Sequence, residues 1–259
     1  MSNDVSQIEA EMHRPWPTGD FVARLRGVGN KRYHDQHPFH LRMNAGTLNA
    51  KQLCGWAANR FYYQRIIPLK DAAILSNCPL REVRRAWIHR ITDHDGIEGG
   101  EGRAAGGIEG WLRLAESTGL GRDEVLNETH VLPGVRFAVD AYVTLVRTQP
   151  WPVAIASSLT EMFAPDLMSR RIDAFERFYP WVESKGIDYF RARVTRARDD
   201  AQEALAFTLA HCNTLSLQQK AVRALETKCE ILWTMLDAIS LAHCSECLRD
   251  SAGAGLESK

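Results

Sequence analysis

The last long helical stretch of the chain carries a lysine on its apolar face. Leu225, Leu232 and Ile239 recur at the spacing of a buried helix face, and Lys228 falls on that same face. A buried ammonium group is costly unless a counter-charge or a ligand pairs with it. Lys228 therefore indicates either a side chain that extends along the surface to reach water or an anion-binding group inside the protein.

Four other stretches place polar side chains on or beside an apolar helical face. These are Arg60 with Gln64, Arg90 with His94, Thr160 with Glu161, and Tyr189 with Arg193. Each has an ordinary alternative, because Arg side chains can reach water from an apolar face, and Arg90 and His94 could cap the carbonyl groups at their helix end. If the helices face one another, the same side chains line a cationic cavity suited to a small, multiply anionic ligand.

Recognisable metal and nucleotide motifs are missing from the sequence. No Glu precedes a His by three residues, as di-iron bundles require, and there is no Walker loop, Gly-x-Gly-x-x-Gly or Gly-x-Ser-x-Gly element. The one cluster with metal-like spacing, His243-Cys244-x-x-Cys247, lacks a second ligand pair. We therefore expect no metal site, although these patterns alone do not define a reaction.

Helical periodicity runs through the whole chain, and strand signals are nearly absent. The expected helices are 18–28, 37–44, 49–67, 69–76, 81–93, 108–117, 134–147, 152–163, 166–178, 189–212 and 217–247. Pro68 is expected to kink or break the third of them, and the glycine-rich stretch 97–107 is expected to be a loop. The sequence therefore predicts an all-α bundle with one domain, 18–248, between a flexible N-terminus, 1–17, and a disordered tail, 249–259.

Charge and hydropathy narrow the class of protein. Lys and Arg total 32, as do Asp and Glu, so the formal net charge is zero. A general nucleic-acid-binding protein would need a basic excess to neutralise phosphates. No apolar run approaches the ~20 residues that span a bilayer, and the polar N-terminus is unlike a signal peptide. We expect a soluble cytoplasmic protein that binds neither nucleic acid nor membrane.

Eight stretches of the chain, spread between about residues 20 and 245, form a recognisable set. They are Tyr33-His34 with His37-Pro38, NRFYYQ (59–64), IPLKDAA (67–73), RITDHDG (90–96), RFAVDAY (136–142), SSLTEMFAP (157–165), YFRAR (189–193) and KCEILWTMLDA (228–238). Together they resemble the pyrroloquinoline-quinone synthase (PqqC) family. The resemblance is long and keeps its order along the chain, which makes it far more specific than one short motif. It implies a heme-oxygenase-like bundle of about seven helices that forms a homodimer.

The resemblance also implies a reaction. Enzymes of this family close the last ring of pyrroloquinoline quinone and carry out an eight-electron oxidation of a bicyclic quinone precursor. They use molecular oxygen as co-substrate, release hydrogen peroxide and need no metal or organic cofactor. The carboxylates and quinone oxygens of such a substrate would explain a cationic cavity. A redox-active substrate would explain the missing metal motifs, because its quinol form can itself reduce oxygen.

Site residues follow from the resemblance position by position. His94 is implied as the principal acid–base residue, and Tyr189 and Arg193 as the pair that supports oxygen and peroxide intermediates. The positions implied to hold the substrate are Tyr33, His34, Arg60, Gln64, Arg90, Tyr142, Thr160, Glu161, Arg171 and Lys228.

One position departs from the family pattern. Many members carry a His in the stretch after Ala-Pro, where this chain has Met168. A Met side chain cannot donate a proton and is only a weak acceptor. Either Tyr189 and Arg193 suffice for oxygen activation, or that activation is weaker here. The alternative function is therefore a protein that binds or carries the quinone without turnover.

Overall fold

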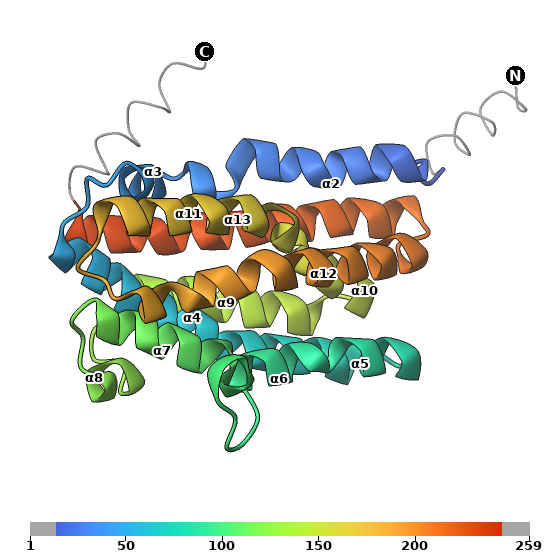
Figure 1. The fold of residues 1–259 in the computed structure, drawn as a ribbon. Helices are drawn as coiled ribbons and strands as arrows, with labels where there is room; N and C mark the ends of the chain where they lie inside the picture. The colour runs from blue at the N-terminus through green and yellow to red at the C-terminus, as the bar shows by residue number, and fades with distance from the viewer. Residues whose placement is uncertain (1–13, 245–259) are drawn as a thin grey trace, which may run out of the picture.

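All regular elements of residues 14–244, the part of the chain that the structure describes, are helices in this computed structural model. The longer helices run side by side along one direction. The first, α2 (Thr18–Arg32), lies along one edge of the bundle, and α5 (Arg81–Trp87) and α6 (His89–Asp95) lie along the opposite edge (Figure 1). The expected all-α fold is confirmed. None of these helices is both long and apolar enough to cross a bilayer.

Seven helices of twelve or more residues form the body of the described bundle. They are α2, α4 (Ala50–Asn77), α7 (Gly106–Ser117), α9 (Pro133–Thr148), α11 (Ala164–Phe178), α12 (Asp188–His211) and α13 (Leu215–His243). The shorter α-helices are α3 (Pro38–Asn44), α5, α6, α8 (Arg122–Leu126) and α10 (Trp151–Ala156). Four 3-10 helices complete the described chain: η1 (His34–Gln36), η2 (Gly102–Ala105), η3 (Ser157–Phe163) and η4 (Ser184–Ile187). The total exceeds the seven or so helices expected because the connections are themselves helical.

Helix α4 continues for 28 residues, so its expected end at Ile67 is wrong. It begins after Asn49, which forms a capping box with Gln52: each side chain accepts a hydrogen bond from the other residue's backbone N–H, at 2.9 and 3.0 Å. Pro68 removes one backbone hydrogen bond, at a cost of about 3 kcal/mol in a helix interior. Packing against α6, α7, α9 and α13 offsets that cost.

Two other expected helices change geometry along their length. The expected 81–93 helix is interrupted at Ile88. There the Ile91 N–H donates a hydrogen bond to the Ile88 carbonyl, three residues back, at an N···O distance of 3.1 Å. The expected 152–163 helix becomes the 3-10 helix η3 from Ser157 onward. These tighter turns alter the direction in which later side chains point. Residues 1–13 of the expected flexible N-terminus, 1–17, and the whole expected tail, 249–259, lie outside the described residues.

A cluster of aromatic side chains joins four of the long helices. Trp56 of α4 and Trp111 of α7 lie 5.2 Å apart between ring centroids, and Phe175 of α11 and Phe190 of α12 lie 5.5 Å apart. All four rings are fully buried. The Arg171 guanidinium lies 5.1 Å from the Trp56 ring centroid, so the apolar core borders directly on buried charge.

Candidate active site

A small cavity of about 60 Å³ lies among α4, α6, η3, α11, α12 and α13. Nine of the predicted site residues line it: Tyr33, His34, Arg60, Gln64, His94, Thr160, Glu161, Tyr189 and Arg193. Its wall also holds Tyr63, Ile67, Ala164, Met168 and Leu232, so the residue that departs from the family pattern is in the wall. The other four predicted residues, Arg90, Tyr142, Arg171 and Lys228, contact this wall from behind or lie beside it.

Three cations at the cavity have no carboxylate partner within residues 14–244. They are Arg60, Arg171 and Lys228, which are 7%, 1% and 0% exposed. Each keeps a buried nitrogen without a hydrogen-bond partner there: Nη1 of Arg60, Nε of Arg171 and Nζ of Lys228. Unsatisfied buried donors are expensive, so this group is suited to an anionic ligand that supplies the missing acceptors.

Aromatic rings partly stabilise two of these cations. The Lys228 Nζ lies 3.5 Å from the Tyr142 ring centroid and 4.1 Å from that of Tyr63, and the Arg60 guanidinium lies 3.7 Å from the Tyr63 centroid. These contacts do not replace a counter-ion. Burial, followed by the charges of Arg60 and Lys70, holds the pKa of Lys228 well below its ordinary value. Burial and the neighbouring Arg60 lower the pKa of Arg171 to about 9.

His40 orients Arg171 and was not predicted from the sequence. The His34 carbonyl can only accept, so His40 Nδ1 donates to it at 2.8 Å. The opposite ring nitrogen, Nε2, then accepts a hydrogen bond from Arg171 Nη2 at 3.2 Å. Burial and Arg171 lower the pKa of His40 well below its ordinary value, so the ring stays neutral and able to accept. A buried His beside Phe39 in the expected 37–44 helix was the available sequence signal.

Arg90 and Arg193 differ from the three unpaired cations because each has carboxylate partners. Arg90 Nη1 donates to Glu161 at 2.8 Å, and Arg193 Nη1 donates to Asp200 at 3.2 Å. Burial opposes the charged form of both arginines, but Glu161 and Asp200 outweigh it for Arg90 and raise its pKa. Tyr189, Glu161 and Asp200 likewise raise the pKa of Arg193. Both guanidinium groups are therefore cationic and held in place.

His94 is placed to act as a base. Its Nδ1 lies 3.2 Å from the Arg90 carbonyl, which can only accept, so Nδ1 carries the hydrogen and Nε2 is the basic nitrogen. Burial, followed by the charge of Arg193, lowers the pKa of His94 to about 4. The ring is therefore neutral at neutral pH.

Tyr189 reaches the cavity from α12, where its hydroxyl donates to Gln64 Oε1 at 2.8 Å. Two glycines of α7 pack beside this part of the cavity. A Cβ on Gly110 would make an ordinary contact with the Tyr189 Cβ at 3.5 Å, whereas one on Gly107 would lie 3.3 Å from the His94 Cδ2, a tighter contact than usual. On the far side of Tyr189, His94 and Arg193 is a second pocket of about 280 Å³ between α7 and α12, so these three side chains separate the two spaces.

Tyr33 and His34 form an aromatic pair at the N-terminal side of the cavity, with ring centroids 4.5 Å apart. His34 Nδ1 is buried without a partner in the described part of the chain. Burial, then Arg60 and Arg171, hold the pKa of His34 well below its ordinary value. Burial raises the pKa of the Tyr33 hydroxyl against the opposing charge of Arg171. Both rings are neutral and can contact a ligand without adding charge.

A buried Lys–Asp pair beside the site was also missed as a site feature. Lys70 Nζ lies 2.5 Å from Asp71 Oδ1 and donates to Ser158 Oγ at 3.1 Å. The same Asp71 oxygen accepts from Trp87 Nε1 at 2.9 Å. Burial lowers the pKa of Lys70, but Asp71 outweighs it and raises the value. The pair lies within IPLKDAA, a stretch that entered the sequence analysis only as a matching motif.

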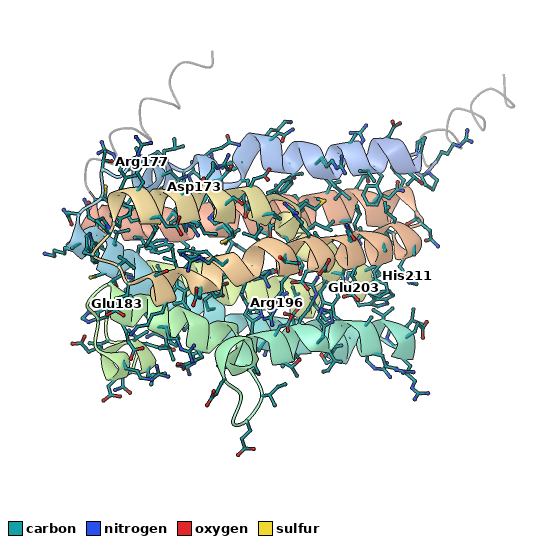
Figure 2. The ribbon with its side chains drawn as sticks, viewed as in Figure 1. Asp173, Arg177, Glu183, Arg196, Glu203 and His211 are labelled. Atoms are coloured by element: carbon teal, nitrogen blue, oxygen red, sulfur yellow. The ribbon has the colours of Figure 1, made fainter. Side chains whose placement is uncertain are left out.

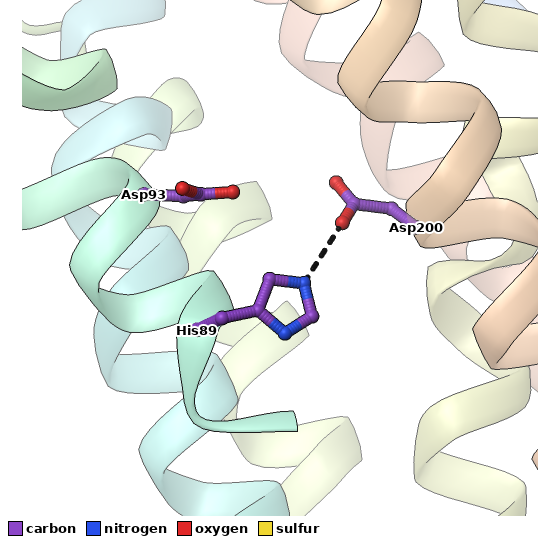
Figure 3. A group of neighbouring side chains, drawn as sticks. All are labelled: His89, Asp93 and Asp200. Atoms are coloured by element: carbon purple, nitrogen blue, oxygen red, sulfur yellow. Dashed lines mark hydrogen bonds and ion pairs between the residues drawn. The ribbon is translucent and has the colours of Figure 1, made fainter. Parts of the chain in front are cut away.

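One group of side chains has the composition of a cation site. One ligand atom each of His89, Asp93 and Asp200 lies within 4.8 Å of the others (Figure 3). Arginines already occupy both carboxylates, since Arg193 bonds Asp200 and Arg196 Nη1 lies 3.6 Å from Asp93 Oδ1. The group therefore carries no metal assignment. The other cluster considered, His243-Cys244-x-x-Cys247, includes a residue outside the described range.

The overall architecture defines the class of protein. A domain of unknown function with a heme oxygenase-like fold from Shewanella denitrificans superposes with a TM-score of 0.68 at 13% identity, covering 86% of this chain and 90% of that one. A TenA homologue from Pseudomonas syringae superposes with a TM-score of 0.67 at 11% identity, covering 88% and 98%. Identities this low show the fold alone. The fold is heme-oxygenase-like.

The chain belongs to the TENA/THI-4/PQQC family, whose family model matches residues 22–238. Among curated relatives, the pyrroloquinoline-quinone synthase of Pseudomonas aeruginosa is 54% identical over 224 residues, covering 86% of this chain and 88% of that protein. The pyrroloquinoline-quinone synthase of Cronobacter sakazakii is 51% identical over 224 residues, covering 86% and 87%. The expected family membership is confirmed.

Proposed function

We propose that this protein catalyses the final step of pyrroloquinoline-quinone synthesis, the ring closure and eight-electron oxidation of a bicyclic quinone precursor. Oxygen is the co-substrate, hydrogen peroxide is released, and no metal or organic cofactor takes part. The observation that carries the proposal is the group of three buried cations, Arg60, Arg171 and Lys228, without carboxylate partners in the described residues. Such a group is matched by a ligand with several carboxylates and quinone oxygens.

In this proposal the three cations bind and orient the ligand, and Arg90 and Arg193 add hydrogen bonds at its other side. Nε2 of His94 accepts a proton from the ring that is being oxidised, since its neutral form prevails at neutral pH. In each oxidation that forms peroxide, two electrons and two protons pass from the ring to O2. Tyr189, held by Gln64, and Arg193 supply hydrogen bonds to the developing peroxide.

The size of the cavity adds a requirement. Pockets for ligands of drug-like size usually measure about 300–1,000 Å³, whereas this cavity measures about 60 Å³. Binding must therefore displace side chains of its wall. The partition formed by Tyr189, His94 and Arg193 adjoins a further 280 Å³ of open space, into which the site can expand.

The second candidate function is a quinone carrier without turnover, and Met168 favours it. Met168 lines the cavity where many family members have a His, which removes one proton donor from the oxygen site. Aerobic incubation with the precursor separates the two functions. An oxidase consumes oxygen and builds the absorbance of the product, whereas a carrier binds the precursor and leaves the oxygen concentration unchanged.

The proposal extends to the molecular setting. We expect a homodimer in the cytoplasm whose only ligands are the precursor, the product and oxygen, without nucleic acid or membrane. Light scattering on the purified full chain tests the dimer, since one chain has a mass of 29.2 kDa. A single species at that mass would contradict it.

A further inference from the structure

Asp200 is a buried carboxylate that holds both active-site arginines but does not line the cavity. It lies on α12 seven residues after Arg193, which places both side chains on one face of the helix. Its Oδ2 accepts from Arg193 Nη1 at 3.2 Å, its Oδ1 lies 3.9 Å from Arg90 Nη2, and its backbone carbonyl accepts from the same Nη2 at 2.5 Å. The side chain is 6% exposed.

Glu161 completes a closed ring of alternating charges with these residues. Its Oε2 accepts from Arg90 Nη1 at 2.8 Å, and its Oε1 lies 3.6 Å from Arg193 Nη2. Each arginine is therefore bound between the same two carboxylates. The two carboxylates differ in position, because Glu161 lines the cavity and Asp200 lies on the outer side of the ring, where His89 Nε2 lies 3.3 Å from Asp200 Oδ1 (Figure 3).

Because of these positions, the two carboxylates respond differently when an anionic ligand enters the cavity. A ligand carboxylate and Glu161 compete for the same donors on Arg90 and Arg193, and like charges in a desolvated site repel. Burial raises the pKa of Glu161 even though Arg90 opposes it, so Glu161 can become neutral. For Asp200, burial is outweighed by His89, Arg90 and Arg193, which hold its pKa below the ordinary value. Asp200 therefore stays charged.

We propose that Asp200 is a positioning residue, which fixes Arg90 and Arg193 at the cavity while Glu161 yields its place on them to an anionic group of the ligand. The identity of that ligand as the quinone rests on the function proposed above. The ring itself requires only an anion. Without Asp200, both guanidinium groups would turn toward Glu161 and away from the geometry that the reaction needs.

The test replaces each acid of the ring by its amide and measures product-quinone affinity and the single-turnover oxidation rate. Asp200→Asn should lower the rate by about 10²-fold, the usual effect of displacing a reacting group by about 1 Å, and should weaken product binding. Glu161→Gln should bind the product at least as tightly as the wild type. Asp199→Asn is the matched control, because Asp199 is the exposed neighbour on the same helix; it should change neither quantity by more than about twofold, a small factor on the scale of that displacement effect.

Two further readouts separate positioning from a merely structural role. Wild-type product affinity should fall more steeply with rising pH than that of Glu161→Gln, because Glu161 must be neutral to yield its place, whereas Lys228 and Arg171 lose charge at high pH in both proteins. Asp200→Glu keeps the charge but shifts it by one methylene, so it should fold and bind the product yet turn over slowly. If Asp200→Asn does not fold, the turnover rate of Asp200→Glu tests the positioning role of Asp200 in its place.

Three outcomes would overturn the inference. They are an Asp200→Asn rate equal to that of Asp199→Asn, weaker product binding in Glu161→Gln, or a normal turnover rate in Asp200→Glu. Failure of the proposed function would look different, since the wild-type protein itself would then oxidise no precursor, whatever its affinity for the product quinone.

Discussion

At the level of single residues, Lys228 is a buried cation that lowers the stability of the fold. Its side chain is fully buried and its Nζ has no hydrogen-bond partner in the described residues. Burying an unpaired polar group costs roughly 1–3 kcal/mol by mutational measurements. We infer that Lys228 serves to bind the ligand. Replacing it should therefore raise the stability of the ligand-free protein and lower its affinity for the ligand.

We predict that Lys228→Met stabilises the ligand-free protein by roughly 1–3 kcal/mol at neutral pH. The pKa of Lys228 is lowered in the folded state, so the unfolded chain binds more protons and wild-type stability rises with pH. The advantage of Lys228→Met should therefore be largest below the folded-state pKa and shrink as pH rises toward the ordinary lysine value of 10.5.

Urea unfolding at neutral and alkaline pH measures this effect. Lys220→Met is the control, because Lys220 is exposed on the same helix and should show no such change. A Lys228→Met protein less stable than the wild type at neutral pH would contradict the account.

We predict that Arg60→Ala and Lys228→Ala each weaken binding of the product quinone. One hydrogen bond to a charged group in a desolvated site is worth roughly 1.5–3 kcal/mol, which is about 10- to 150-fold in affinity. Titration calorimetry measures it, with Arg85→Ala as the control because Arg85 is an exposed cation on α5. Unchanged affinity in both variants, with folding intact, would mean that the unpaired cations do not contact the ligand.

We predict that His94→Asn folds and binds the precursor but stalls its oxidation. General acid–base catalysis contributes about 10²–10⁴-fold, so the rate should fall by a factor in that range. Single-turnover absorbance under air gives the rate, and circular dichroism controls for folding. A rate within about twofold of the wild type would be trivial beside that range. His94 would then be a structural residue, and proton transfer would pass to Tyr189.

The site residues predicted from the sequence can be recognised within their own helix, whereas the missed ones depend on a partner elsewhere in the chain. Arg60, Arg90 and Lys228 could be identified because each interrupts an apolar stripe of its own helix. His40 and Asp200 act through a residue on another helix or another turn, and nothing in their local spacing indicates the partner. The roles of the individual residues came from family resemblance, since periodicity cannot show which side of a cavity a side chain occupies.

At the level of elements, Asn59 connects α4 to the segment that precedes α9. Its Nδ2 donates to the carbonyls of Gly55 and His130 at 2.8 and 3.1 Å, and its Oδ1 accepts from the Leu132 N–H at 2.8 Å. The Asn59 side chain is fully buried, and Arg60 is the next residue along the chain. It therefore fixes the helix that presents the unpaired guanidinium against the start of α9.

We predict that Asn59→Ala lowers the free energy of unfolding by roughly 2–4 kcal/mol, because three hydrogen bonds worth about 1 kcal/mol each are lost and the part-buried His130 carbonyl and Leu132 N–H lose their side-chain partner. Asn49→Ala, which removes only the cap of the same helix, should cost about 1 kcal/mol. Urea unfolding of both variants gives the comparison. Equal effects would show that the 130–132 segment is not held by Asn59.

Helix ends could be predicted where residues close in the sequence determine them. They could not be predicted where packing against distant helices determines them. The expected boundaries at residues 49, 117 and 134 agree closely with the structure, because the cap at Asn49, the positive φ of Gly119 and the fixed φ of Pro133 each act within one turn. Pro68 does not end α4, contrary to the expectation, because helices far away in the sequence pack against α4. The short helix α8, Arg122–Leu126, was missed because five residues are too few to show a helical period.

At the level of the whole molecule, paired charges also lie along the outer face of the bundle. The labelled Arg196 of α12, for example, lies on the side of α12 toward α6 (Figure 2), where it pairs with Asp93 at 3.6 Å. The unpaired cations are inside instead, against the aromatic core. Buried cations without a counter-charge are the reverse of what stability alone favours, and they supply binding free energy for one anionic ligand.

The measurement that tests the central claim most directly is oxygen uptake by the full chain supplied with the quinone precursor, on protein whose metal and flavin content has been determined. We predict much less than one metal or flavin per chain, oxygen consumption that survives chelation, hydrogen peroxide in the medium and the absorbance of the product quinone. About one iron or zinc per chain with activity lost on chelation would contradict it. So would tight binding of the precursor with no oxygen consumed, which would make the protein a carrier.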